Sequence, residues 1–350
     1  MTTPDIDIRI DGRTGHITLT REKALNALTY DMCLAIEAAL DSWREDSRVA
    51  MVLIDAAGSR AFCAGGDIAE MYESGMRQDF DYGRRFWRDE YRMNAKLFNF
   101  PKPVVSLMQG FTMGGGVGVG CHGSHRVVGE SSQIAMPEVS IGLIPDVGGS
   151  LILSRAPGRL GEYLGLTAAR MGPGDAIYAG FADYFVPETN WPELTAELIE
   201  TGDWTRVDAF ARPAPGAILP ALQPEIDAHF AGETLGDISR SLRFSDSEFA
   251  KETLDKLSRN SPLSMAATVE ILHRVRGTDE IARALEQEYR FTHRAMEHAD
   301  FLEGIRAQII DKDRNPHWKH KGCEAVPAPD VANILLPLKS AALDLKETRP

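Results

Sequence analysis

Residues 103–128 read PVVSLMQGFTMGGGVGVGCHGSHRVV, and this stretch decides the fold. An apolar strand over 103–107 leads into a glycine cluster, which is followed by a short helix and by a second strand over 126–128. Strand, glycine turn, helix and strand in this order are typical of a sheet whose parallel strands are joined by helices. The stretch therefore predicts an α/β fold with mostly parallel strands.

The segments on the N-terminal side of this stretch predict more of the same sheet. Two alternating segments, 6–10 and 16–19, flank Asp11-Gly12 in the pattern of a β-hairpin. Thr29 is a suitable N-cap for the helix that should follow it. The apolar face of that helix is expected to carry Leu34, Ile36, Leu40 and Trp43.

The organisation of the chain changes after about residue 185. Before it, a buried strand at 49–54 and a helix at 82–98 are expected, whereas helical periodicity dominates after it. We therefore divide the chain into a core, 1–185, which would carry the site, and a mainly helical C-terminal extension, 186–350. Helices of the extension are expected at 192–199, 247–257, 264–273 and 280–296, with a linker at 213–215. The stretch after Lys319 mixes proline and lysine, and we expect it to be loosely ordered.

The composition limits the class of protein. The chain has 350 residues and a formal net charge of −13, which argues against a nucleic-acid partner because phosphate binding needs a basic face. It has neither a basic and apolar leader nor a run of 18 apolar residues. We therefore expect no signal peptide, no membrane association and a cytoplasmic location. The widely spaced Cys33, Cys63, Cys121 and Cys323 predict reduced thiols rather than a zinc site or disulfides.

Two glycine loops would let a ligand approach the backbone closely. The first is FCAGGDI at 62–68 and the second is GFTMGGGVGVG at 110–120, and each is expected between a strand and a helix. Free N–H groups at such turns stabilise developing negative charge, so one N–H from each loop would form an oxyanion hole. Each loop on its own is equally consistent with an ordinary packing turn.

The second loop also matches the dinucleotide-binding pattern G-x-G-x-x-G at 118–123, with Glu138 twenty residues after Gly118. That fingerprint must open a full helix directly after a strand. The turn lies earlier in this chain, and the strand at 126 leaves no room for a crossover helix after Gly123. We therefore reject a nicotinamide site.

A third segment, AMPEVSIGLIPDVGG at 135–149, holds Glu138 and Asp146 among apolar and small residues. Burial raises the pKa of a carboxyl group, and two neighbouring carboxyl groups push their pKa values apart. Such a pair is suited to general acid–base or nucleophilic chemistry. Taken alone, however, both residues are expected to be exposed loop acids, which is the usual state of Asp and Glu.

These three segments, in this order and with KALNAL at 23–28, resemble the crotonase (enoyl-CoA hydratase/isomerase) superfamily. The resemblance implies a spiral of repeated ββα turns, an acyl-coenzyme A (acyl-CoA) substrate, and neither a metal nor a redox cofactor. It assigns the oxyanion donors to the backbone N–H groups of Gly66 and Gly115. It assigns the CoA site to Lys23, Ala24, Leu25, Ala64, Gly65, Asp67 and Ile68.

The acidic residues make the resemblance more specific. A hydratase of this superfamily has a catalytic Glu three residues after the second oxyanion donor, but here that position is Gly118. The other hydratase Glu matches Glu138, and Asp146 stands where the hydratase has a small residue. This exchange resembles the 3-hydroxyisobutyryl-CoA hydrolase family, as do RDEY at 88–91 and DFLEGIR at 300–306.

The hydrolase resemblance implies cleavage of 3-hydroxyisobutyryl-CoA, an intermediate of valine degradation, to 3-hydroxyisobutyrate and free CoA. Glu138 would act either as a nucleophile, through a mixed anhydride, or as a general base for water. Asp146 would position that water or the substrate hydroxyl, and Glu90 would complete the acyl pocket. The substrate-binding residues would be Glu90, Gly115, Glu138 and Asp146.

Two alternatives and one open question accompany this interpretation. An enoyl-CoA hydratase or isomerase is the first alternative, and Gly118 argues against it. A non-catalytic acyl-CoA binding protein is the second, and the presence of both Glu138 and Asp146 argues against it. The sequence leaves open whether the chain forms a homo-oligomer.

Overall fold

The computed structural model describes residues 2–345, which form two compact units. The first unit takes the segments up to residue 67, 92–135 and 170–220, and the second takes the segments 68–91, 136–169 and those from 221 onward. The two units are thus interleaved along the chain rather than divided at residue 185. The reason is that the chain directly after 185 packs on the strands of the first unit, whereas 136–169 packs with the C-terminal helices.

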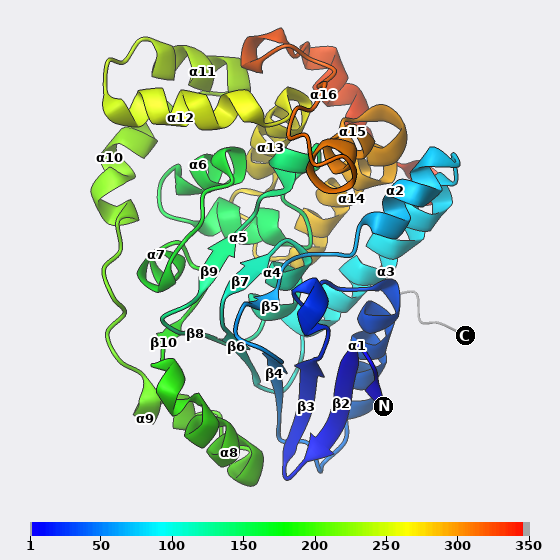
Figure 1. Cartoon of the computed structure of the whole chain (residues 1–350), viewed down its shortest axis with the longest axis vertical. Helices are drawn as coiled ribbons and strands as arrows, with labels where there is room; N and C mark the ends of the chain where they lie inside the picture. The colour runs from blue at the N-terminus through cyan, green and yellow to red at the C-terminus, as the bar shows by residue number, and fades with distance from the viewer. Residues whose placement is uncertain (1, 346–350) are drawn as a thin grey trace. The chain divides into compact units, whose positions relative to one another are not determined.

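All the named strands belong to the first unit, where they form two sheets (Figure 1). Seven strands are ordered β1-β2-β3-β4-β6-β8-β10, and three shorter strands are ordered β5-β7-β9. The strands are β1 (Thr2–Thr3), β2 (Ile6–Asp11), β3 (Thr14–Leu19), β4 (Met51–Ala56), β5 (Ala61–Cys63), β6 (Val104–Met108), β7 (Phe111–Met113), β8 (His125–Val128), β9 (Gln133–Ala135) and β10 (Tyr184–Phe185).

Successive strands alternate between the two sheets, which makes the first unit a ββα spiral. β4, β6 and β8 pair in parallel in the large sheet, while β5, β7 and β9, which directly follow them in the chain, pair in parallel in the small sheet. The expected hairpin is β2 and β3, which pair antiparallel with Ile8 opposite Ile17. Gly12 lies in its turn with a φ of +55°, a conformation that favours glycine. The predicted α/β fold with mostly parallel strands is confirmed.

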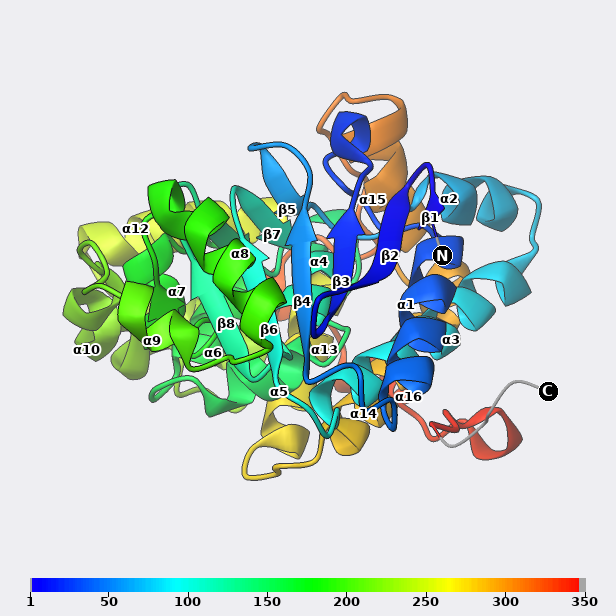
Figure 2. The same ribbon diagram turned by 90° about the horizontal axis from the view of Figure 1, so that it is seen from below.

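One apolar layer of the first unit lies between the large sheet and helix α8. Alternate residues of the central strands, including Leu53 on β4, Leu107 on β6 and Val127 on β8, pack against Leu194 and Leu198 of α8. Figure 2 shows α8 lying across β6 and β8. The helices of this unit are η1 (Glu22–Ala24), α1 (Tyr30–Trp43), α4 (Gly115–Gly120), α7 (Pro173–Tyr178), η3 (Glu188–Asn190), α8 (Trp191–Thr201) and α9 (Arg206–Phe210).

Helix α1 begins as predicted but buries a slightly different face. The Thr29 hydroxyl accepts a hydrogen bond from the Met32 N–H at 3.2 Å and caps the helix. Ile36, Leu40 and Trp43 are buried, but Leu34 is only half-buried. Leu34 lies off the buried stripe, and Met32 and Cys33 are buried in its place.

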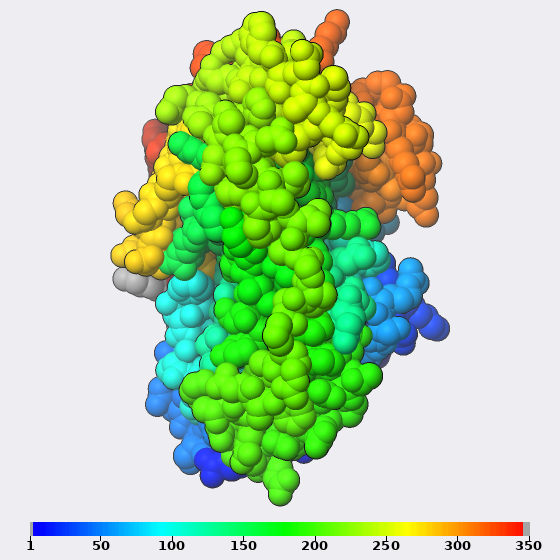
Figure 3. All heavy atoms as spheres, turned by 90° about the vertical axis from the view of Figure 1, so that its left-hand side faces the viewer, coloured from blue at the N-terminus to red at the C-terminus, as the bar shows by residue number. Residues whose placement is uncertain are grey.

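The second unit is helical, as expected for most of the C-terminal part. Its elements are α2 (Ala69–Met76), α3 (Phe80–Phe98, of which 92–98 belong to the first unit), η2 (Glu138–Ile141), α5 (Gly149–Arg155), α6 (Leu160–Thr167), α10 (Leu219–His229), α11 (Leu235–Arg243), α12 (Glu248–Arg259), α13 (Pro262–Val275), α14 (Ile281–His298), α15 (Phe301–Ile305), the π-helix η4 (Arg306–Ile310), η5 (Cys323–Ala325), α16 (Ala328–Ile334) and η6 (Lys339–Ala341). The predicted linker near 213–215 lies in a mostly exposed stretch that runs over the surface as the light-green chain of Figure 3.

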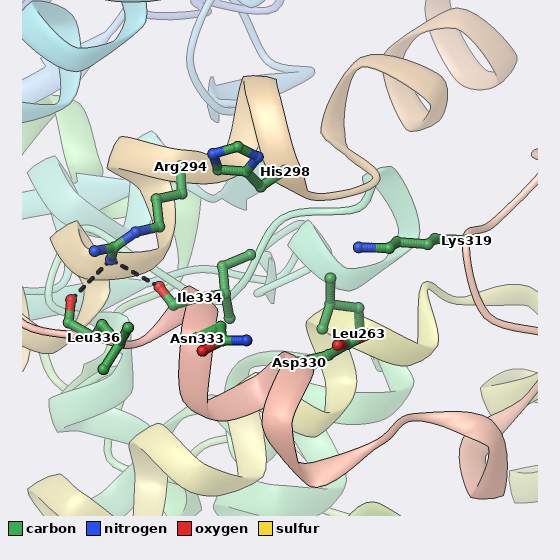
Figure 4. Close-up of a pocket in the computed structure, with 8 residues that line it drawn as sticks. All are labelled: Leu263, Arg294, His298, Lys319, Asp330, Asn333, Ile334 and Leu336. Carbon is green, nitrogen blue, oxygen red and sulfur yellow. Dashed lines mark hydrogen bonds between the residues drawn. The ribbon is translucent and has the colours of Figure 1, made fainter.

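The stretch after Lys319 is more ordered than its composition predicts. It contains α16, and both Ile334 and Leu335 are buried. The Arg294 guanidinium donates hydrogen bonds to the carbonyl oxygens of Ile334 at 3.0 Å and Leu336 at 2.8 Å (Figure 4). These contacts beside a cavity of about 360 Å³ hold the segment, and the expectation of a loosely ordered tail is wrong as far as residue 345. The last five residues lie outside the described part.

Two further expectations concern membranes and thiols. Within residues 2–345, no helix has both the length and the apolar character needed to span a bilayer. All four cysteines are described, and none of them forms a disulfide. Burial raises the pKa of the Cys121 thiol to about 12, which makes it an unreactive packing residue.

Candidate active site

Three of the predicted site residues come together as a buried group of carboxyl side chains in the second unit. Glu90 lies on α3, Glu138 begins η2, and Asp146 lies in the loop between η2 and α5. Their exposed fractions are only 3%, 4% and 4%. The expectation from the residues alone, that Glu138 and Asp146 are exposed loop acids, is therefore wrong. Apolar residues next to them in sequence, including Val139 and Ile144, are fully buried and draw the acids inward.

Burial controls the electrostatics of this group. It raises the pKa of Glu138 and of Glu90 well above the ordinary value, and the charge of Asp146 raises both further. Burial also raises the pKa of Asp146, to about 7, although a hydrogen bond from Tyr91 lowers it. Several buried carboxyl groups that interact electrostatically cannot all be ionised at neutral pH. The group can therefore both supply and accept a proton near pH 7.

Asp146 is held by Tyr91, which is the last residue of α3 that belongs to the second unit. The Tyr91 hydroxyl donates to Asp146 Oδ2 at 2.8 Å and lies 3.4 Å from the Thr292 hydroxyl. Burial raises the pKa of Tyr91 well above its ordinary value, so the phenol stays protonated and keeps donating. This interaction orients one oxygen of the Asp146 carboxylate.

The segment that carries Glu138 packs against the C-terminal motif at 300–306. The Glu138 carbonyl accepts from the Leu143 N–H at 3.0 Å, which closes the turn of η2. A Cβ at Gly142 would lie 2.4 Å from the Asp300 carbonyl group, and one at Gly304 would lie 2.1 Å from the Ile141 oxygen. These close backbone contacts need glycine and fix η2 against α15. The motif thus supports the segment that carries Glu138.

Two oxygens of the group are left without a protein partner. Glu138 Oε2 and Glu90 Oε1 are buried, and neither has a hydrogen-bond partner among the described residues. Buried polar atoms are nearly always satisfied, so an exception calls for a role. Both atoms are suited to accept a hydrogen bond from a substrate or a reacting water.

The two predicted oxyanion loops lie beside each other in the first unit. Gly115 is the first residue of α4, so its N–H has no acceptor within the helix. A Cβ at the next residue, Gly116, would lie 2.2 Å from the Cys63 carbonyl oxygen, which places the start of α4 against the first loop. A Cβ at Gly66 would meet no described atom within 4 Å. The protein's own packing therefore does not require glycine at Gly66, whereas a ligand lying against its backbone would.

The residues assigned to CoA also form one local structure in the first unit. The Ala64 N–H donates to the Leu25 carbonyl at 3.0 Å, and the Leu28 N–H donates to the Gly65 carbonyl at 2.9 Å. The structure thus brings Lys23, Ala24 and Leu25 beside Ala64, Gly65 and Asp67. Ile68, the remaining residue, begins the second unit as the N-cap of α2.

An ion pair of this local structure was not predicted. Arg21 donates to Asp67 Oδ2 at 2.6 Å and to the Ala27 carbonyl at 3.0 Å. Asp67 is therefore already engaged by a cation from its own unit. Lys23, in contrast, is exposed.

Several residues that support the carboxyl group escaped the sequence analysis. Tyr91 contacts Asp146, Glu288 contacts its loop, and Thr292 contacts Tyr91, but all three lie 55 or more residues from Asp146 in the chain. The quoted RDEY segment includes Tyr91, yet nothing in its spacing indicates a hydrogen bond to Asp146. The long amphipathic pattern of α14 likewise gave no sign that Glu288 turns inward.

Comparison with known proteins shows similarity over almost the whole chain. A family model described as enoyl-CoA hydratase/isomerase matches residues 14–335. The mitochondrial 3-hydroxyisobutyryl-CoA hydrolase of Gallus gallus is 35% identical, and the match covers 97% of this chain and 91% of that protein. The Homo sapiens protein of the same name is 36% identical over 95% of this chain and 88% of that protein.

Two solved structures share both fold and sequence with this chain. One, an enoyl-CoA hydratase from Rhodobacter sphaeroides 2.4.1, is 58% identical with a TM-score of 0.93, and the match covers 97% of this chain and 99% of that one. The other, a carnitinyl-CoA dehydratase from Mycobacterium thermoresistibile, is 39% identical with a TM-score of 0.94, and the match covers 99% of this chain and 100% of that one. The names of these similar proteins thus include both hydrolases and hydratases or dehydratases.

Proposed function

We propose that this chain, which belongs to the enoyl-CoA hydratase/isomerase family, hydrolyses a short 3-hydroxyacyl-CoA, with 3-hydroxyisobutyryl-CoA as its substrate. The products are 3-hydroxyisobutyrate and free CoA, a step of valine degradation. Relatives about 36% identical over most of their length carry the name of this hydrolase. CoA is part of the substrate, and the proposed reaction uses no other cofactor.

The observation that carries the proposal is the buried pair of Glu138 and Asp146. Glu138 has a raised pKa and an oxygen without a partner among the described residues, and Tyr91 orients Asp146. A hydratase of the family needs a second glutamate where this chain has Gly118. Gly118 lies inside α4, where its carbonyl accepts a hydrogen bond from the Asn94 amide at 3.1 Å. The acids that are present thus suit attack on a thioester better than addition across a double bond.

The proposed chemistry assigns a separate task to each group. The backbone N–H groups of Gly66 and Gly115 bind the thioester oxygen as it gains negative charge, an assignment that rests on the family pattern. Glu138 either attacks the carbonyl carbon itself or removes a proton from the water that does. The carbon–sulfur bond breaks and the CoA sulfur takes up a proton. Where Glu138 itself attacks, water then hydrolyses the mixed anhydride and restores Glu138, and by either route the acyl group leaves as a carboxylate. Both roles of Glu138 remain compatible with this scheme.

Asp146 and Glu90 complete the acyl end of the proposed site. The second oxygen of Asp146, which is not the one held by Tyr91, accepts a hydrogen bond from the 3-hydroxyl or from the attacking water. Glu90, whose Oε1 has no hydrogen-bond partner within residues 2–345, contacts the acyl group. The segments at 23–25 and 64–68 hold the CoA moiety. We retain the cytoplasm as the proposed location, although the relatives are named as mitochondrial proteins.

An enoyl-CoA hydratase is the second candidate, because the structure that is 58% identical to this chain carries that name. One experiment separates the candidates: the protein is offered 3-hydroxyisobutyryl-CoA, isobutyryl-CoA and crotonyl-CoA, while a thiol reagent reports free CoA and ultraviolet absorbance reports the enoyl double bond. Thiol release, fastest with 3-hydroxyisobutyryl-CoA, is the expected result. Loss of enoyl absorbance without thiol release would identify a hydratase. Binding of all three without turnover would identify a non-catalytic acyl-CoA binding protein.

A further inference from the structure

The loop that carries Asp146 has a strained backbone. Val147, directly after Asp146, has a φ of +53°, and Gly148 has a φ of +80°. A positive φ is unfavourable for any side chain and especially for a β-branched residue. Such a conformation persists only where the surrounding structure holds it in place. Some group must therefore fix the backbone on the C-terminal side of Asp146.

That group is the side chain of Glu288, which comes from α14. Glu288 is fully buried, with an exposed fraction of 0%. Its Oε2 accepts the Gly148 N–H at 2.8 Å, and its Oε1 accepts the Ser150 N–H at 3.1 Å and also the Ser150 hydroxyl. Helix α5 begins at Gly149 and has no side-chain cap of its own, since its N-cap is Gly148. Glu288, which lies on another helix, therefore caps the N-terminus of α5. It binds the residues on both sides of Gly149, the first residue of α5.

The same helix also supports the other partner of Asp146. Thr292 lies one turn after Glu288, and its hydroxyl is 3.4 Å from that of Tyr91. The Tyr289 ring meets the Tyr91 ring edge-on, with centroids 6.1 Å apart. Tyr91 in turn donates to Asp146 at 2.8 Å. Helix α14 thus holds Asp146 by two routes, one through the backbone of its loop and one through the phenol that binds its carboxylate.

Charge also links Glu288 to the reacting group. Burial raises the pKa of Glu288 to about 8, while its three hydrogen-bond donors lower it and the charge of Asp146 raises it. Glu288 in turn raises the pKa of Glu138, although by less than burial and the charge of Asp146 do. Glu288 therefore lies close enough to the carboxyl group to interact with it electrostatically, as well as contacting the Asp146 loop.

We infer that Glu288 is a positioning residue for the proposed thioester hydrolysis: it clamps the strained loop after Asp146 and so sets where that carboxylate lies. The inference rests on the proposed function and adds to it a group that does not touch the substrate. An amide in its place would offer only one acceptor oxygen to three donors and would set an NH₂ group against a backbone N–H. Glu288→Gln should therefore loosen the loop while preserving the volume of the side chain.

The test is a double-mutant cycle of Glu288→Gln with Asp146→Asn, assayed by thiol release from 3-hydroxyisobutyryl-CoA. Alone, Glu288→Gln should lower kcat about 10- to 100-fold with little change in KM, since small displacements of a reacting group have effects of this size. In the Asp146→Asn background it should lower kcat further by less than about threefold.

The matched control is Glu162→Gln, which changes another fully buried glutamate of the second unit. Glu162 pairs with Arg159 and Arg276, and among the described residues none of its hydrogen bonds or ion pairs reaches the Asp146 loop. It should cost stability yet change kcat little. Equal losses of kcat from Glu288→Gln in both backgrounds would overturn the inference and leave Glu288 a structural residue.

Two provisions keep the outcome clear. If Glu288→Gln does not fold, Ser150→Ala removes one donor to Glu288 and should lower kcat severalfold, with the same loss of effect in the Asp146→Asn background. An unchanged kcat in Ser150→Ala would then overturn the inference. Failure of the proposed function would look different, because the unmodified chain itself would release no thiol from 3-hydroxyisobutyryl-CoA.

Discussion

Glu138 differs from an ordinary glutamate in its burial and in its Oε2, which lacks a hydrogen-bond partner in the described part of the chain. We expect Glu138→Gln to lower kcat at least about 100-fold, because the amide keeps the shape but can neither attack a carbonyl nor take up a proton. CoA affinity should survive, since all the residues assigned to CoA except Ile68 lie in the other unit. The measurements are thiol release and CoA binding by calorimetry. A variant that keeps more than about a tenth of kcat would refute the role.

Asp146 is expected to decide which acyl group is accepted. Asp146→Gly should lower kcat/KM for 3-hydroxyisobutyryl-CoA more than for isobutyryl-CoA, because only the first offers a hydroxyl donor to the lost carboxylate. The two values are compared in the variant and in the unmodified chain. Equal losses would mean that Asp146 positions water instead, and no loss in either would make it a structural acid.

Single residues were also where prediction from sequence was weakest. Glu138 and Asp146 were selected through the family resemblance, since isolated acids of this kind are usually exposed. Tyr91 and Glu288 were not selected, because their importance lies in hydrogen bonds to residues 55 and about 140 positions away. Hydrogen-bond partners that far apart in the chain leave no periodic trace in a single sequence.

Secondary structure elements were predicted better, because their signals are local. The hairpin of β2 and β3, the Thr29 cap and the alternation from β4 to β8 all follow from short patterns and are confirmed. The sequence did not predict that the C-terminal segment is ordered, because this depends on hydrogen bonds from Arg294 to the carbonyl oxygens of Ile334 and Leu336. The burial of Leu34 was overestimated for a similar reason, since the exact position of the stripe depends on what packs against it.

The contact between α15 and η2 yields a prediction about these two elements. Gly304→Ala would place a Cβ 2.1 Å from the Ile141 oxygen and so push apart α15 and the segment that carries Glu138. We expect the free energy of unfolding to fall by about 1–3 kcal/mol, the usual range for overpacking, and kcat to fall with it. Urea unfolding and thiol release measure both effects.

Gly216→Ala is the matched control for this substitution. A Cβ at Gly216 meets no described atom within 4 Å, and its residue lies in the surface stretch of the first unit. It should change neither stability nor kcat. If Gly304→Ala behaves like Gly216→Ala, the packing of α15 on η2 does not support Glu138.

At the scale of the whole molecule, the buried acids should make stability depend on pH. Burial raises the pKa of Asp146 from its ordinary 3.8 to about 7 and that of Glu288 from 4.5 to about 8. Between the ordinary and the raised pKa values, the folded chain binds more protons than the unfolded chain. The free energy of unfolding should therefore fall as the pH rises from about 5 to about 8. Urea titrations across this range test the sign.

Surface repulsion in a chain of net charge −13 would give the same sign, so salt provides the control. About 0.5 M sodium chloride screens exposed charges over a few ångströms but acts little on buried ones. The slope should therefore persist in salt and become shallower in Asp146→Asn. A stability that rises with pH over this range would contradict the raised pKa values.

The interleaving of the two units also has a consequence for the order in which the protein is made. A ribosome completes every segment of the first unit once Pro220 has been added, so that unit has all its residues well before synthesis ends. Glu90, Glu138 and Asp146 emerge early too, but Glu288 follows Asp146 by 142 residues. The nascent chain thus carries its acidic centre for more than a hundred elongation steps before the residue that clamps the Asp146 loop exists. A chain that ends before α14 would therefore contain the acids that we assign to the chemistry but would lack Glu288, which fixes the position of the Asp146 loop.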